Sequence, residues 1–194
     1  MLKMENDNGD ESQKNQTYAV EFIKPEAVIQ EIGIADSSVV ADFGCAGGYF
    51  SLPIAKKIGE NGVVYALDIL PQSLEMVAGY AKTMGLTNII TKRVNLEKEA
   101  GSTLKEASCD WVIMKNMLFQ NKDKKIIIKE AIRILKQGGK ILIIEWDDKD
   151  FSIGPEKSLR ISKEALMETI QDVGMSILME VPVSNFHYGL ILVK

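Results

Sequence analysis

The strongest constraint on the fold is a repeated alternation between short apolar strand patterns and longer amphipathic helix patterns. Strand patterns rich in β-branched residues end at Phe43 and then span 62–68, 88–94, 110–115, 140–146, 177–181 and 188–193. Helix patterns lie between them, over 25–32, 50–58, 71–84, 122–135 and 163–173. Such alternation forms right-handed βαβ units, in which helices cover both faces of a parallel sheet. The chain is therefore predicted to adopt a doubly wound α/β fold.

The last two predicted strands, 177–181 and 188–193, are separated by only six residues. A parallel crossover needs about a dozen residues or more, so these two strands must pair as an antiparallel hairpin. We therefore expect a seven-stranded, mostly parallel sheet with an antiparallel final strand.

Residues at the ends of the helix patterns support this division of the chain. Pro25 and Pro71 stand at first helical positions, where a missing N–H group costs nothing. Ser162 is the expected N-cap of the last helix, and Gly174 its expected end.

Two stretches are less regular. The helix over 122–135 is expected to stop because Gly138 and Gly139 follow it. The stretch 97–108 carries a weaker pattern and is predicted to be a loose helix.

Length and charge limit the class of protein. The chain has 194 residues, which is the size of one domain. Its net charge of −4 and its isoelectric point near 5.2 argue against a surface that grips phosphate backbones. A nucleic acid is therefore not an expected partner.

Cysteine content and hydropathy favour a cytoplasmic protein. Cys45 and Cys109 cannot make a disulfide framework, and no His, Cys or acidic cluster has the spacing of a metal site. No apolar run approaches the roughly 18 residues of a membrane span, and acidic residues near the start argue against a signal peptide. Residues 1–17 are almost entirely polar, so we expect a disordered tail before one domain over 18–194.

A glycine-rich turn follows the first predicted strand and is the first candidate site. The segment reads Asp-Phe-Gly-Cys-Ala-Gly-Gly over 42–48. Glycines at this position let a ligand approach main-chain N–H groups at a helix start. A dinucleotide fingerprint requires G-x-G-x-x-G, whereas the chain gives G-C-A-G-G-Y from Gly44. A nicotinamide-dependent oxidoreductase is therefore disfavoured.

Asp68 ends the second predicted strand, 20 residues after Gly48. A carboxylate at this point can accept hydrogen bonds from both hydroxyls of a ribose, which is how many α/β folds hold an adenosine. The alternative is a solvent-exposed acid that starts the turn before Pro71.

Together these segments resemble class I S-adenosylmethionine-dependent methyltransferases, from Phe22 to Lys194. The matching stretches are VVADFGCAGG, GVVYALDI, CDWVIMKNMLF, EAIRILKQGGKILIIEW and HYGLILVK. The resemblance is greatest to the branch near the ubiquinone/menaquinone biosynthesis C-methyltransferases. It implies a Rossmann-like methyltransferase fold and methyl transfer from S-adenosylmethionine to a small or medium-sized molecule, with S-adenosylhomocysteine as product.

The resemblance also implies roles for particular residues. The methionine part of the cofactor would be lined by Asp42, Gly44, Cys45, Ala46 and Gly48. The ribose would bind Asp68, and the adenine would contact Ile69, Asn95 and Leu96. Two residues depart from the family pattern: Ala46 replaces the usual middle glycine, and Asn95 stands where Asp is common.

Methyl transfer needs few catalytic groups from the protein, because alignment of the acceptor, the methyl group and the sulfur provides much of the rate acceleration. A general base is needed only if the acceptor must lose a proton. His187, the only histidine, lies in the turn between the last two strands and is the candidate catalytic base. The alternative is that His187 only packs beside Tyr188.

Further residues are predicted to face the acceptor because they follow the fourth and fifth strands or begin the last one. They are Asn116, Phe119, Gln120, Glu145, Trp146 and Tyr188. The alternatives are helix-start packing for the first group and an exposed acidic loop after the fifth strand.

Other possibilities stay open at this stage. The chain has few residues to cover an acceptor, so a non-catalytic S-adenosylmethionine-binding module, a subunit completed by a partner, or a homodimer would also fit. An RNA methyltransferase would need a basic patch, which the acidic charge balance disfavours.

Overall fold

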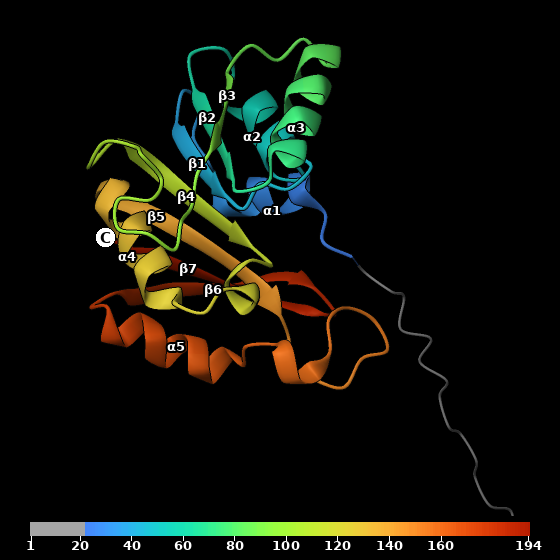
Figure 1. Ribbon diagram of the computed structural model, residues 1–194, viewed down its shortest axis with the longest axis vertical. Helices are drawn as coiled ribbons and strands as arrows, with labels where there is room; N and C mark the ends of the chain where they lie inside the picture. The colour runs from blue at the N-terminus through green and yellow to red at the C-terminus, as the bar shows by residue number, and fades with distance from the viewer. Residues whose placement is uncertain (1–21) are drawn as a thin grey trace, which may run out of the picture.

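The computed structural model describes residues 22–194, and the tail predicted over 1–17 lies outside this range. The described residues form one seven-stranded sheet with helices on both faces (Figure 1). The strands are β1 (Val39–Phe43), β2 (Val63–Asp68), β3 (Ile89–Arg93), β4 (Cys109–Lys115), β5 (Leu135–Trp146), β6 (Ser176–Ser184) and β7 (His187–Val193). The helices are α1 (Pro25–Ile32), α2 (Ser51–Ile58), α3 (Pro71–Thr83), α4 (Lys124–Ile134) and α5 (Lys163–Asp172), with 3₁₀ turns η1 (Leu118–Gln120) and η2 (Lys157–Leu159).

The strand order is β3-β2-β1-β4-β5-β7-β6. Strands β1 to β5 pair in parallel, whereas β7 is antiparallel to both β5 and β6. The predicted fold class and the final hairpin are therefore confirmed. The order reverses between β1 and β4, and in such sheets ligands bind beyond the carboxyl ends of the strands at this point.

The two faces of the sheet each bury a separate apolar core, because successive strand residues point to opposite sides. On β4, Val112 and Met114 pack with α4 and α5, while Trp111 and Ile113 pack with α1 and α2. Helix α3 covers the same face as α2, through Val77 against β2. These helices fix the strand ends from which the site is built.

The helix starts agree with the sequence. Pro25 and Pro71 occupy the first turns of α1 and α3, and the Ser162 side chain accepts a hydrogen bond from the Ala165 N–H. Within residues 22–194, the structure contains no helix long and apolar enough to cross a membrane.

The prediction that glycines end the fourth long helix is wrong. Helix α4 begins after Asp123, whose side chain accepts from the Ile126 N–H at 3.1 Å, and it ends at Ile134. Leu135 is already extended, so β5 follows without a loop and Gly138 and Gly139 lie inside it. The glycines mark a shift in the β4–β5 register rather than a helix end.

The loose helix predicted over 97–108 is also wrong, since this stretch is a series of turns. Its backbone is held by Glu130 of α4, which accepts from both the N–H and the hydroxyl of Ser102. Arg133 donates to Glu130 at 2.7 Å and to the carbonyl oxygen of Leu104 at 2.8 Å. Tertiary hydrogen bonds from another helix, which local pattern cannot reveal, replace the intrahelical ones.

Removing this carboxylate should destabilise the fold. We expect Glu130→Gln to lower the free energy of unfolding by about 2 kcal/mol, because it weakens charge-assisted hydrogen bonds at a buried site. The exposed Glu99→Gln is the control and should change stability by less than about 0.5 kcal/mol. Urea denaturation at neutral pH measures both.

The cost of Glu130→Gln should also depend on pH. Burial alone would raise the pKa of Glu130, but hydrogen bonds from Arg133 and Ser102 outweigh burial and leave it below the ordinary value. A group whose pKa is lowered by folding stabilises the protein above its unfolded pKa, and this contribution is lost as the pH falls. The difference between variant and wild type should therefore shrink in acid, and a constant difference would contradict the assignment.

Candidate functional site

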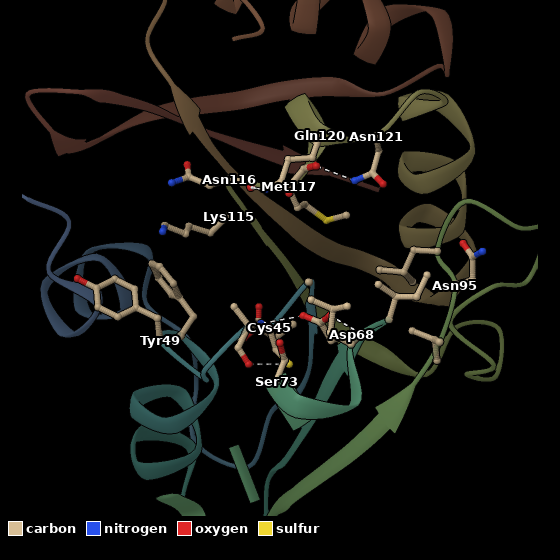
Figure 2. Close-up of a pocket in the computed structure, with 18 of the residues that line it drawn as sticks. Cys45, Tyr49, Asp68, Ser73, Asn95, Lys115, Asn116, Met117, Gln120 and Asn121 are labelled. Carbon is tan, nitrogen blue, oxygen red and sulfur yellow. Dashed lines mark hydrogen bonds between the residues drawn. The ribbon is translucent and has the colours of Figure 1, made fainter. Parts of the chain in front are cut away.

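A cavity of about 490 Å³ opens at the carboxyl ends of β1, β2 and β4 (Figure 2). Most of the residues predicted for a cofactor line it: Asp42, Gly44, Cys45, Ala46, Asp68, Ile69, Asn95 and Leu96. Asn116 and Gln120, predicted for the acceptor, line it as well. Residues far apart in the sequence therefore meet in one hollow at the point where the strand order reverses.

The turn after β1 is fastened to β2. The N–H groups of Gly44 and Cys45 donate to the carbonyl oxygen of Leu67 at 2.8 and 3.0 Å. Asp68 accepts from the Ala46 N–H through Oδ2 and from the Leu70 N–H through Oδ1, both at 2.9 Å. Each carboxylate oxygen has two lone-pair positions, so Asp68 keeps one acceptor position on each oxygen.

The backbone conformation of the turn and the space around it explain why its residues are small. Gly44 and Ala46 have φ angles of +69° and +46°, the left-handed region that glycine adopts at least cost. A side chain at Gly44 would approach Met117 Cβ at 3.3 Å, at the wall of the cavity. Ala46 therefore occupies a conformation suited to the glycine that is usual in the family, and its N–H still reaches Asp68.

Gly48, predicted to line the cofactor, lies outside the cavity. Its φ angle is +85°, and a Cβ atom there would approach Leu52 Cγ and Val77 Cγ2 at 3.2 Å. Gly48 thus lets helices α2 and α3 pack closely beside the turn.

Asp42 is buried beneath the turn, with Oδ2 accepting from the Ser51 hydroxyl at 2.5 Å. Burial raises the pKa of Asp42 to about 6, although the Ser51 hydrogen bonds oppose the shift. Burial also raises the pKa of the Cys45 thiol, so Cys45 is a thiol and not a thiolate nucleophile at neutral pH.

The cavity has two chemically different ends. Figure 2 shows Asn95 at one end and Lys115, Asn116 and Tyr49 at the other, with Asp68 between them. At the first end, the Asn95 Oδ1 atom accepts from the Glu97 N–H at 3.0 Å.

At the second end, the side chain of Asn116 joins β4 to β5 and β7. With its amide oxygen turned toward them, Asn116 accepts from Lys115 Nζ at 3.1 Å, Trp146 Nε1 at 3.2 Å and His187 Nε2 at 3.1 Å. Trp146 and Lys115 can only donate, so they fix this orientation of the amide. The φ angle of Asn116 is +52°, a conformation that asparagine tolerates better than most residues.

His187, the predicted base, does not line the cavity and reaches it only through Asn116. Its second nitrogen, Nδ1, lies 2.8 Å from the Ser184 hydroxyl, and its ring stacks on Trp146 with centroids 4.0 Å apart. Burial and the positive charges of Lys115 and Arg160 lower the pKa of His187 to about 4. The imidazole is therefore neutral at pH 7, with both nitrogens in hydrogen bonds.

The remaining residues predicted to face the acceptor do not line the cavity, and these include Trp146, which is held by Asn116. Glu145 is fully buried, and its Oε1 accepts from the Leu118 N–H at 2.7 Å, which holds η1 in position. Burial raises the pKa of Glu145 to about 7. Phe119 packs against the core, and the Tyr188 hydroxyl donates to the Ile161 carbonyl oxygen at 2.9 Å.

Several residues line the cavity although the sequence did not predict them there: Tyr49, Phe50, Leu70, Ser73, Val94, Glu97, Lys115, Met117 and Asn121. The place of Lys115 in the cavity could have been predicted, because it is the last residue of β4 and so lies at the carboxyl edge of the sheet. The places of Ser73 and Asn121 could not, since they depend on how α3 and η1 pack. Within residues 22–194, no three His, Cys, Asp or Glu residues lie together as metal ligands would.

Comparison with known proteins agrees with this geometry. The family described as "Methyltransferase domain" matches residues 34–181. An arsenite methyltransferase from Aquipseudomonas alcaligenes is 25% identical over 112 residues, covering 56% of this chain and 32% of that protein. A ubiquinone/menaquinone biosynthesis C-methyltransferase from Haemophilus ducreyi is 28% identical over 136 residues, covering 70% of this chain and 51% of that protein. The chain thus spans about a third and about half of the length of these curated relatives.

Among solved structures, a SAM-dependent methyltransferase from Aquifex aeolicus superposes with a TM-score of 0.82. It shares 22% sequence identity, and the match covers 89% of this chain and 90% of that one. This likeness shows the fold.

Because His187 is the only histidine, its ionisation can be followed directly. We expect the imidazole resonance in NMR spectra to titrate near pH 4, well below its ordinary value of 6.5, because burial and nearby cations disfavour the charged form. Folding lowers this pKa, so stability from this group falls as the pH drops from about 6.5 toward 4.

Lys115→Met removes one of those cations and should raise the measured pKa, whereas Lys122→Met on the surface should not. If the His187 imidazole of the wild-type protein titrates near pH 6.5, the ring is solvated, and His187 would again be a candidate catalytic base.

Proposed function

Because the chain belongs to the methyltransferase domain family, we propose that it transfers a methyl group from S-adenosylmethionine to a small or medium-sized molecule. The observation that carries the proposal is the hydrogen bond from the Ala46 N–H of the glycine-rich turn to Asp68, both of which line the cavity. This arrangement brings main-chain groups and a carboxylate to the same side of the hollow, as an adenosine-containing ligand requires.

In the proposed complex, Asp68 accepts hydrogen bonds from the ribose hydroxyls through the lone pairs that the backbone leaves available. Ile69, Leu96 and Asn95 supply the apolar faces and the amide for the adenine. The methionine part lies along the turn from Gly44 to Ala46, above Asp42.

The charges of the cavity suit this cofactor. S-adenosylmethionine, when bound, supplies an electrophilic methyl group on a positively charged sulfur. Asp42 and Asp68 line the cavity and would provide negative charge on the side of the sulfonium and the amino group. The main work of the chain is to hold the two reactants in line and to exclude water around them.

A small or medium-sized acceptor is supported by the size of the cavity and by the relatives, an arsenite methyltransferase and a ubiquinone/menaquinone biosynthesis C-methyltransferase. The predicted cytoplasmic location fits the two free cysteines, which are both buried. A homodimer stays a prediction.

Calorimetric titration tests the cofactor. We expect micromolar binding of S-adenosylmethionine and S-adenosylhomocysteine and no binding of NAD, whose fingerprint the turn lacks. Asp68→Ala should weaken both by about 10- to 100-fold, because two ribose hydroxyls lose a charged acceptor and the turn loses its anchor.

The control is Asp150→Ala, which removes an exposed acid and should bind the cofactor like wild type. Folding of Asp68→Ala is checked by circular dichroism. Unchanged affinity in a folded Asp68→Ala protein would refute the ribose assignment, and binding of NAD alone would refute the proposed function.

A further inference from the structure

Lys115 places a half-buried positive charge at the acceptor end of a cavity that is otherwise acidic. It is the last residue of β4 and lines the cavity, and its ammonium group lies beside Asn116 and Tyr49 (Figure 2). Burial lowers the pKa of Lys115, while Glu145 and Asp42 raise it. The group sits within reach of a ligand and does not simply point to solvent.

The charge has no direct ionic partner within residues 22–194. No carboxylate there lies within 4.0 Å of the Lys115 ammonium group, although six other ion pairs are present. Its contacts are the Asn116 oxygen at 3.1 Å and the face of the Tyr49 ring, whose centroid is 5.4 Å away. Both hold a cation in place without neutralising it.

Within residues 22–194, no side chain at this end other than Lys115 itself offers a free basic atom to an acceptor. His187 is neutral, but both of its nitrogens are engaged behind Asn116. Glu145 is buried behind the wall, and Gln120 and Asn116 are amides. At the other end, Glu97 accepts from the Lys122 N–H at 2.9 Å. An acceptor with an acidic proton must therefore lose that proton before the transfer.

We propose that the acceptor binds as an anion, a thiolate, phenolate or enolate, and that the Lys115 ammonium group selects and stabilises this anion. This inference rests on the proposed function. The acceptor proton goes to solvent, the acceptor lone pair forms the bond to the methyl carbon, and the carbon–sulfur electron pair returns to sulfur. An anion and a sulfonium thus become two neutral groups.

The charges around the cavity explain why an anion is required at this position. The sulfonium of the proposed cofactor and the Lys115 ammonium group would repel each other across the hollow. An anionic acceptor between them is attracted to both, which both binds it and aligns it for transfer. An opposite charge within about 4–6 Å lowers the pKa of an acid by about one unit or more.

The test uses 4-nitrophenol, whose phenolate absorbs visible light. In the wild-type protein saturated with S-adenosylhomocysteine, we expect the bound phenol to ionise about one pH unit below the free phenol. Lys115→Arg keeps a permanent cation and should keep this shift, while Lys115→Met should abolish it. Lys122→Met, an exposed lysine, is the matched control and should behave like wild type.

The groups that face Lys115 are Glu145 of β5, His187 of β7, Asp42 of β1 and Tyr49, which follows the glycine-rich turn. The pKa values of Asp42 and Glu145 lie near 6 and 7, so both groups titrate within the range of the experiment. Because Lys115→Met also raises the pKa values of Asp42 and His187, the phenolate absorbance of each variant is read against the titration of that variant without the phenol.

Three results would overturn the proposal. An identical shift in Lys115→Met and wild type would show that the ammonium group does not act on the phenolate. Loss of the shift in Lys115→Arg as well would make Lys115 a proton acceptor, because arginine cannot serve as one. In the third result, neither the wild type nor Lys115→Met shifts the pKa of the phenol. Lys115→Met then binds S-adenosylhomocysteine at least tenfold more weakly than the wild type does, but binds 5′-methylthioadenosine equally well. Lys115 would in that case hold the cofactor carboxylate.

Calorimetry on wild type and on each variant separates this inference from the proposed function. If the wild-type protein fails to bind S-adenosylhomocysteine, the cofactor assignment fails. If it binds and the phenol does not shift, only the anionic acceptor is refuted.

Discussion

The hydrogen bonds of Asp68 are the interaction on which the site depends. One carboxylate takes the N–H groups of Ala46 and Leu70, and so ties the turn after β1 to the end of β2. Without this link, the left-handed turn at Ala46 would have no partner for its N–H group. The same carboxylate lines the cavity, so the residue that holds the turn is also the one proposed to bind the ribose.

Asn116 is the corresponding junction at the end of the cavity that Lys115 and Tyr49 line. Its oxygen gathers donors from Lys115, Trp146 and His187, which come from β4, β5 and β7. The junction explains how the lone histidine can lie near the cavity and still be a neutral packing residue. It also holds the Lys115 ammonium group where an anionic acceptor would meet it. Polar side chains here act through one another, so their roles follow from the network rather than from residue type.

Local pattern predicted the elements well where residue periodicity and the residues at the element ends decide them. The strand and helix periods, Pro25, Pro71 and the Ser162 cap all agree with the structure. It failed over 97–108, where Glu130 of a distant helix holds the backbone. It failed again at Gly138 and Gly139, because pairing with β4 decides that β5 begins at Leu135.

The sequence by itself determined the doubly wound fold, the turn after β1 and the acid at the end of β2, because period, spacing and glycine conformation are local properties. It therefore also determined most of the cavity wall that the turn after β1 and the end of β2 form. Only the tertiary structure decided the wall beyond the end of β4. There, burial withdraws Glu145, Phe119 and His187 from the cavity, and the end of β4 brings Lys115 into it. Whether a polar side chain faces a ligand or a core depends on packing between strands that are distant in the sequence.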